Sequence, residues 1–160
     1  MTGADIEPTA KNHYSPFNIA EISKEKPAVI ARTLLYIVVS LQQLDPGFDQ
    51  ARLQSIPAVQ ARIERILATV NALVTSDDEF VTTMEGLECL VLQGMFYING
   101  GSPRRAWLIF RRALSIGQLM GLQKTTASSV FPNARNMWHR MVQGDRYLVC
   151  GDFHLEKLIC

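Results

Sequence analysis

The chain has 160 residues, of which 48% are hydrophobic and 19% are charged, and its formal net charge is +1. This length suits a single domain, and the composition provides enough apolar side chains for a core without the charge excess of a disordered segment. The near-neutral net charge argues against nucleic-acid binding through a broad basic surface.

No secretory signal peptide is predicted, because the first residues are polar and lack an apolar core segment. The most apolar run, Pro27 to Leu44, contains Arg32 and is shorter than the roughly 20 residues that a membrane span requires. We therefore expect this run to form a buried core helix and not a membrane span.

We divide the chain into a flexible N-terminal segment, residues 1–14, and a helical domain, residues 15–160. Ser15-Pro16 joins an N-cap residue to a first-turn proline and predicts a short helix that ends at about Lys24. Pro27 begins a second helix whose apolar residues cover nearly its whole circumference. Such a helix is normally enclosed by others.

The turn residues Asp45-Pro46-Gly47 end this helix, and Pro57 begins the next one. From Val59 to Val74, Leu73 included, apolar residues recur at helical spacing, with polar residues on the opposite face. Ser76-Asp77-Asp78 ends that helix and caps the following one, since acidic residues suit the positive end of the helix dipole. One apolar stripe then runs through Phe80, Met84, Leu87, Val91, Met95 and Ile98.

Asn99-Gly100-Gly101 breaks this helix, and Ser102-Pro103 caps and begins another, which should run to about Met120 with Gly121 as its C-cap. A helical wheel separates its polar side from an apolar side formed by Ala106, Trp107, Phe110, Ala113, Leu114, Gly117 and Met120. The small residues allow close approach of another helix, and the short turn predicts an antiparallel helix hairpin.

A polar loop, Thr125 to Pro132, leads to a last helix that Asn133 caps and that runs to about Cys150. No segment shows the sustained period-two alternation of a strand, so the predicted fold class is all-α, an array of antiparallel helix hairpins with five or six helices. Glycines inside the helices indicate either close helix contacts or hollow space, at Gly86, Gly94 and Gly117.

The segment Leu87 to Gln123, LECLVLQGMFYINGGSPRRAWLIFRRALSIGQLMGLQ, resembles the middle homology region of fungal zinc-cluster transcription factors. That region has a helix of the form LQALLLLALY, a glycine turn and a segment AW…GLAIRLAQDLGLH. Farther on, Arg135-Asn136-Met137-Trp138 and Asp145-Arg146-Tyr147-Leu148 are similar to the family's RRRxW…DRxLSLxLGRP element. The similarity covers roughly Pro27 to Phe153.

The resemblance implies a regulatory, ligand-responsive or dimer-supporting helical domain of a nuclear transcription factor. The family's DNA-binding module is a two-zinc cluster held by six cysteines, whereas this chain has three cysteines. It would therefore reach DNA only through a separate zinc-cluster module. The family domain usually continues beyond the Asp-Arg element, so with the chain ending at Cys160 we expect the domain to be incomplete at its C-terminus.

The expected partners are other proteins or a second copy of the chain, with a small-molecule effector as a further class. Neither a membrane partner nor a resident cofactor is expected. The cysteines Cys89, Cys150 and Cys160 fall in no paired spacing, which favours a reducing compartment, and the resemblance implies the nucleus.

Three aromatic residues are candidates for a structural or regulatory role, namely Trp107, Phe110 and Trp138. We expect both tryptophans to be core anchors, and for Trp138 a ligand-stacking role is the alternative. Asp145 and Arg146, with Arg135 and Arg140 earlier in the same helix, are expected to form an ion-pair network that locks this helix to its neighbours. A catalytic carboxylate is the less favoured interpretation of Asp145.

A basic face is formed by four arginines, Arg104, Arg105, Arg111 and Arg112. One interpretation is that they contact phosphate or an acidic segment of a partner. The other is that they are solvated and paired in part with carboxylates of neighbouring helices. The second interpretation is favoured.

A catalytic or metal site has little support. Cys150, Asp152, His154 and His139 fit no zinc-binding spacing, and neither a GxSxG elbow nor a glycine-rich phosphate loop is present. We therefore predict that the chain is not an enzyme. The alternative to a transcriptional role is a helical protein–protein interaction scaffold, although no repeat of about 34 residues is visible.

Overall fold

A computed structural model describes residues 19–44, 59–124 and 134–150. Within these ranges the α-helices, in chain order, are α1 (Ile19–Ile22), α2 (Pro27–Gln42), α3 (Val59–Val70), α4 (Asp78–Val81), α5 (Met84–Asn99), α6 (Pro103–Leu119) and α7 (Ala134–Cys150). A π-helical turn, Asn71–Thr75, extends α3, and a 3-10 turn, Leu122–Lys124, follows α6.

The prediction of an all-α fold is confirmed. The predicted segments at residues 1–14, Ser15-Pro16, Thr125 to Pro132 and Asn133 lie outside the described residues. Within the ranges that the structure describes, no helix combines the length and the hydropathy needed to cross a membrane.

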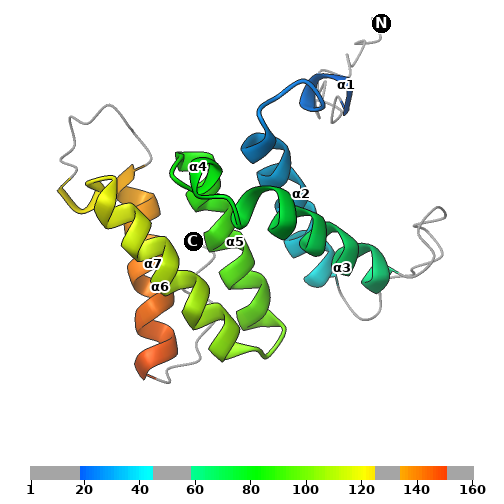
Figure 1. Ribbon diagram of the computed structural model, residues 1–160. Coiled ribbons are helices and arrows are strands. Elements are labelled where there is room, and N and C mark those ends of the chain that lie inside the picture. The colour runs from blue at the N-terminus through cyan, green and yellow to red at the C-terminus, as the bar shows by residue number, and fades with distance from the viewer. Residues whose placement is uncertain (1–18, 45–58, 125–133, 151–160) are drawn as a thin grey trace, which may run out of the picture.

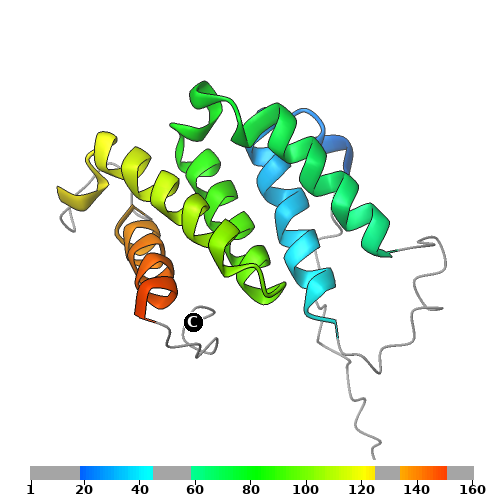
Figure 2. The ribbon, with the colours of Figure 1, turned by 60° about the horizontal axis from the view of Figure 1, so that its bottom comes forward.

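α5 lies at the centre of the array (Figures 1 and 2). It packs against α2 on one side and against α6 on the other, while α7 packs on α6 and also reaches α5. α3 runs beside α2, and α5 and α6 form the antiparallel hairpin that their short connection predicts. Gly101 has a φ of 67°, so the connection uses a backbone conformation that glycine adopts without strain.

The core consists of two groups of buried side chains that share α5. The Phe110 cluster joins α5 to α4, α6 and α7, with Phe110 and Met141 fully buried. The Leu35 cluster joins α5 to α2, α3 and the π turn, with Leu35 and Leu92 at its centre. Because α5 contributes to both clusters, it is buried around most of its circumference, and this burial outweighs the presence of two glycines in the helix.

Phe110 lies between two glycines on different helices. A Cβ atom at Gly94 of α5 would be 2.6 Å from the Phe110 ring, and one at Gly144 of α7 would be 2.5 Å from it. Any side chain at either position would displace the ring, so the two glycines form the notch that the ring fills. Gly144 was not singled out by the sequence pattern.

The two other glycines singled out from the sequence also mark close contacts. A Cβ at Gly86 would be 2.0 Å from the backbone oxygen of Phe80, where the start of α5 crosses α4. One at Gly117 would be 2.9 Å from the terminal methyl of Met141. The structure therefore decides the open question at these positions in favour of close helix contact.

The predicted enclosure of the Pro27 helix is wrong. α2 buries one face, which includes Leu35 and Val38, whereas Tyr36 and Ile37 are exposed. α2 packs chiefly on α5 and also touches α3, α4 and the π turn, whereas several apolar residues on its other sides remain partly accessible.

One predicted helix is divided in two in the structure. The helix expected after Ser76-Asp77-Asp78 is divided into α4 and α5 at Thr82-Thr83. Asp77 caps α4 by accepting a hydrogen bond from the Glu79 amide at 2.9 Å, and Thr83 caps α5 through the Gly86 amide at 3.1 Å. The Asp77 cap was predicted and the Thr83 cap was not. Each satisfies an amide that would otherwise lack a partner at a helix start.

The π turn changes the register at the end of α3. Leu73 belongs to the apolar stripe if the helix keeps 3.6 residues per turn, yet its side chain is 64% exposed. A π-helical turn holds more residues than an α-helical one, so Leu73 rotates off the stripe while Val74 stays buried.

Candidate ligand cavity

A cavity of about 630 Å³ lies between α3 and α6, with α5 as its floor and the π turn at one end. Its volume is within the range of small-molecule sites, roughly 300–1,000 Å³. A neighbouring hollow of about 580 Å³ shares Gln60, Phe96 and Tyr97 with it and continues toward the end of α2. The cavity exists because α3 packs on α2 and not on α6.

Two buried polar side chains line the cavity, Gln93 on its floor and Thr75 at its π-turn end, and they are the buried polar side chains of the described core. Thr75 is 1% exposed and Gln93 is 5% exposed. The Gln93 Nε2 donates to Thr75 Oγ1 at 3.3 Å, and this hydroxyl donates to Asn71 Oδ1 at 3.2 Å. All three residues line the cavity. Burying an amide is unfavourable unless it is hydrogen-bonded, so this chain of bonds makes a glutamine tolerable in the middle of α5.

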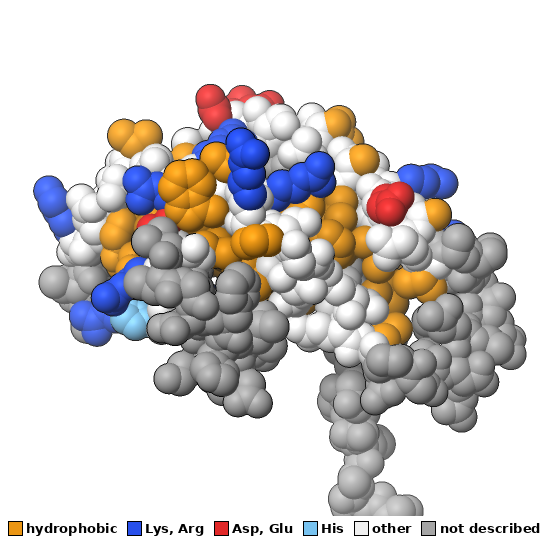
Figure 3. Space-filling view, turned by 90° about the horizontal axis from the view of Figure 1, so that it is seen from below, with side chains coloured by type: hydrophobic (Ala, Val, Ile, Leu, Met, Phe, Trp, Pro, Cys, Tyr) orange, Lys and Arg blue, Asp and Glu red, His pale blue; other side chains and the backbone are white. Residues whose placement is uncertain are grey.

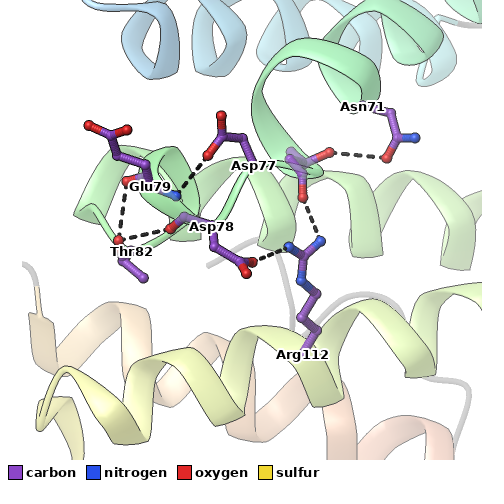
Figure 4. A network of polar contacts seen from close by, with 7 residues as sticks. Asn71, Asp77, Asp78, Glu79, Thr82 and Arg112 are labelled. Carbon is purple, nitrogen blue, oxygen red and sulfur yellow. Dashed lines mark hydrogen bonds and ion pairs between the residues drawn. The ribbon is translucent and has the colours of Figure 1, made fainter.

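Arg112 holds the π-turn end of the cavity together (Figure 4). Its Nη2 lies 3.0 Å from Asp78 Oδ1, and its Nη1 donates to the backbone carbonyl of Thr75. The Thr82 hydroxyl donates to the Asp78 carbonyl and so supports the same short helix. The Asp78 carboxylate is well exposed, so the carbonyl bond contributes more to the connection than the ion pair.

Arg105 stands on the α6 wall of the cavity. Its guanidinium carbon is 5.8 Å from the centre of the Tyr97 ring, a distance that permits a cation–π interaction. Within the described ranges, no carboxylate oxygen lies at ion-pair distance from this side chain. Its N–H groups therefore remain available to a group that enters the cavity.

The structure divides the four predicted surface arginines among different surroundings. Arg111 pairs with Asp145 at 3.4 Å and Arg112 with Asp78, whereas Arg105 covers Tyr97 and Arg104 is exposed. On one face of the molecule, basic side chains lie between hydrophobic ones with few acidic groups among them (Figure 3). The basic residues of α6 thus do not form one continuous site.

Asp145 lies opposite α6, and its partner differs from those expected. It pairs with Arg111 of α6, whereas Arg146 and Arg135 of its own helix are exposed. Arg140 donates toward the Met95 sulfur at 3.8 Å. The other carboxylate oxygen, Oδ1, is buried, and no hydrogen-bond partner for it is found in the described structure. The contact therefore joins α6 to α7, through an arginine that sequence spacing within one helix did not indicate.

The three candidate aromatic residues have different surroundings. Phe110 is completely buried. Trp138 of α7 is partly buried against α6, where it packs near Gly117. The prediction that Trp107 anchors the core is wrong, because its side chain is 38% exposed and Arg111 lies 5.9 Å from its ring centre. α7 covers the part of the apolar side of α6 that carries Ala113 and Gly117, whereas Trp107 lies at the edge of that side and is left toward solvent.

Two groups have perturbed acidity. Burial raises the pKa of the Cys89 thiol to about 12, and its Sγ donates to the Ala28 carbonyl at 3.6 Å. Such a thiol remains protonated near neutral pH and is a poor nucleophile. Although the Tyr36 side chain is partly exposed, desolvation of its hydroxyl and the hydrogen bond that it donates to Glu88 raise the pKa of Tyr36. Glu88 also pairs with Arg32 at 3.1 Å. These contacts join α2 to α5.

In the described part of the chain, no three His, Cys, Asp or Glu side chains gather closely enough to hold a metal ion. Asp152 and His154, which belong to the weak candidate set at the C-terminus, lie outside that part, and the side chain of Cys150 is not described.

Sequence reasoning did not find the polar floor of the cavity. Gln93 is the one polar side chain in the run LVLQGMF of α5, and this isolated position was the available signal. Asn71 and Thr75 gave none, because only the π turn brings them over the floor.

The chain is similar to fungal transcription factors and biosynthesis regulators. It is 50% identical over 98 residues to the transcription factor sdnS of Sordaria araneosa, a match that covers 61% of this chain and 13% of that protein. It is 34% identical over 131 residues to the transcription factor eupR of a Phoma species, a match that covers 76% of this chain and 28% of that protein. A dehydrocurvularin biosynthesis regulator of Alternaria cinerariae is 31% identical over 130 residues, covering 76% and 17%.

The chain thus spans less than a third of the length of these relatives. No family model matches the sequence, and no solved structure matches it. The resemblance to fungal transcription factors, first visible in the residues from Leu87 onward, is confirmed by these relatives. The chain is a homologue of fungal transcription factors and corresponds to a segment of them.

Proposed function

We propose that this chain is a regulatory, helical part of fungal transcription control that does not itself contact DNA. It would act in the nucleus through the sensing of a ligand or partner, the support of a dimer, or both. The observation that carries the proposal is the 50% identity to a transcription factor over 98 residues. The near-neutral charge and the three cysteines support an indirect route to DNA, since a six-cysteine zinc cluster would have to be supplied by a separate module.

The proposed mechanism is a shift between two spacings of α3 and α6. These helices are separated by the cavity and joined at one end through Arg112 and the π turn. A molecule that binds one spacing more tightly than the other shifts the population toward that spacing. A catalytic role is not proposed, because the described cysteine is buried and protonated and the described carboxylates lack a paired arrangement in the cavity.

The experiment is a tethered reporter assay. The full chain is joined to an unrelated DNA-binding domain, and transcription from a matching promoter is compared with that of the DNA-binding domain alone. We expect a change in transcription, and we expect a fluorescent fusion of the chain to accumulate in the nucleus.

The control variant is Phe110→Ala, which removes the centre of one core cluster and should abolish the effect, whereas Arg104→Gln should retain it. An intact, nuclear fusion that leaves reporter transcription unchanged would contradict the proposal and favour a scaffold without a transcriptional role.

A further inference from the structure

We propose that the cavity between α3 and α6 binds a small organic anion. Its apolar part would consist of two or three rings, and its acidic group would contact Arg105. This deepens the proposed function, because such a molecule would be the effector to which the helices respond. The binding step itself is a property of this chain and can be measured without any transcriptional assay.

The apolar part of the proposed ligand follows from the walls of the cavity. Leu67 on α3 faces Leu108 and Ile109 on α6, and Phe96 forms part of the floor. Leu108 is 54% exposed although it lies at the cavity wall. A bound apolar body would remove this surface from water, which favours binding in proportion to the area that is covered.

The polar part follows from hydrogen-bonding groups that the protein leaves open. Gln93 is more than nine-tenths buried and lines the cavity, and it uses its Nε2 on Thr75. Asn71 uses its Oδ1 on the same hydroxyl. Among the described residues, neither the Gln93 Oε1 nor the Asn71 Nδ2 has a protein partner. One acceptor on the floor and one donor at the π-turn end are thus available to fix the orientation of a ligand.

The negative charge follows from the difference between the two arginines of the cavity. Arg112 already binds Asp78 and the Thr75 carbonyl, whereas Arg105 has the Tyr97 ring as its neighbour and no carboxylate. A ligand carboxylate or sulfonate would give Arg105 a charge-assisted hydrogen bond. Glu64 on the opposite wall accepts a hydrogen bond from Gln60, and its charge disfavours a second acidic group on the ligand.

A compact ligand fits better than a peptide helix. Gln93 lies on the floor and is 5% exposed, so a peptide helix about 10 Å wide would not reach its open Oε1. The cavity volume of about 630 Å³ suits a molecule of two or three rings.

The test uses two fluorescent probes of nearly the same shape, 1-anilinonaphthalene-8-sulfonate and N-phenyl-1-naphthylamine, which lacks the sulfonate. Each probe is titrated into the purified full chain and into two variants, Arg105→Gln and Arg104→Gln. The variants remove the same charge from adjacent exposed positions on α6, but only Arg105 lines the cavity. A third variant, Ala68→Trp, places a large side chain at an exposed position of the α3 wall.

We expect one saturable site for the sulfonate probe, and a loss of affinity of roughly three- to tenfold in Arg105→Gln, the range for a charge-assisted contact at a partly exposed site. Arg104→Gln should bind like the unchanged protein, and Ala68→Trp should bind weakly. The uncharged probe should bind more weakly than the sulfonate and should not distinguish the two arginine variants.

Equal affinities of the sulfonate probe for Arg105→Gln and Arg104→Gln would overturn the proposal, and so would non-saturable binding unaffected by Ala68→Trp. Displacement of the probe by an acidic helical peptide, but not by aromatic carboxylates, would also overturn it and favour a peptide partner. If the reporter is silent but the probe binds, the transcriptional role is rejected and the ligand site is retained. If the reporter responds but the probe does not bind, the ligand site is rejected and the transcriptional role is retained.

Discussion

The two sides of α5 are packed in different ways. On the side of α6 and α7, a single aromatic ring fills a notch between Gly94 and Gly144, and the surrounding residues are apolar. On the side of α3, buried polar groups line a cavity, and a π turn interrupts the helix above it. The first arrangement tolerates little change in volume, whereas the second retains space and unused hydrogen-bonding capacity. We infer that stability is concentrated around Phe110 and that responsiveness is concentrated between α3 and α6.

The most direct way to break this comparison is to truncate a large side chain on each side. Phe110→Ala should lower the free energy of unfolding by about 3–5 kcal/mol, because it removes buried apolar surface and leaves a cavity in a rigid setting. Leu108→Ala, at the wall of the α3 cavity, should change it by only about 0.5 kcal/mol. Urea denaturation followed by circular dichroism measures both. Similar losses for the two variants would refute the proposed difference.

A smaller effect separates a rigid contact from a flexible one. Gly144→Ala brings a methyl group to 2.5 Å from the Phe110 ring, which Gly94 blocks on its other side, and should destabilise the chain by about 1–3 kcal/mol. At Gly117→Ala the one contact under 3.0 Å is with the terminal methyl of Met141, which can rotate away, and the contacts with Leu122 and Trp138 at 3.5 Å are ordinary, so this variant should cost less. Because both substitutions replace a helical glycine by alanine, their gain in helix propensity is the same. Thermal unfolding of the pair tests the order, and a more stable Gly144→Ala would contradict it.

The pH dependence of stability tests whether water is excluded from the Leu35 cluster, to which Cys89 belongs. The folded protein raises the pKa of Cys89 from 9.0 to about 12, so the unfolded chain loses this proton first as the pH rises. The contribution is constant below pH 9 and decreases between pH 9 and pH 12, by about 1.4 kcal/mol at pH 10. Denaturation at pH 8 and pH 10 measures it, with Cys89→Ala as the control that removes this titration. An equal pH dependence in the two proteins would show that water reaches the thiol.

The smallest effect is expected inside the cavity itself. Ala68→Trp adds a large side chain where space is available, so the free energy of unfolding should stay within about 0.5 kcal/mol of that of the unchanged protein. Differential scanning calorimetry at matched pH provides the measurement. A loss comparable to that of Gly144→Ala would mean that the α3 side is packed as tightly as the Phe110 side.

Much of the helical array was predictable because its signals are local. Pro27, Asp77 and Pro103 mark helix starts through capping and first-turn proline geometry, and the apolar stripe of α5 predicts that one of its faces is buried. The division between α4 and α5 was missed, since Thr82-Thr83 does not interrupt the apolar spacing. The exposure of Trp107 was missed because a helical wheel shows which residues share a face but not which face α7 covers.

The candidate site was less predictable than the fold. The basic residues of α6 were visible in the sequence. Which of them form ion pairs, namely Arg111 and Arg112, and which cavity residue does not, namely Arg105, depends on where Asp78 and Asp145 lie in space. Gln93 stood out only as a polar exception in an apolar helix. Its bonds to Thr75 depend on the π turn, which no propensity in the sequence indicated.

The sequence by itself determined the all-α class, most helix limits, the helix hairpin of α5 and α6, and the relation to fungal transcription factors, because these follow from periodicity, capping and the order of residues along the chain. Only the tertiary structure decided which of the two cavity arginines is left without a carboxylate, which glycines receive the Phe110 ring and where a cavity remains. Those properties depend on distances between residues far apart in the chain. Such distances are set by the packing of whole helices, which local patterns do not specify.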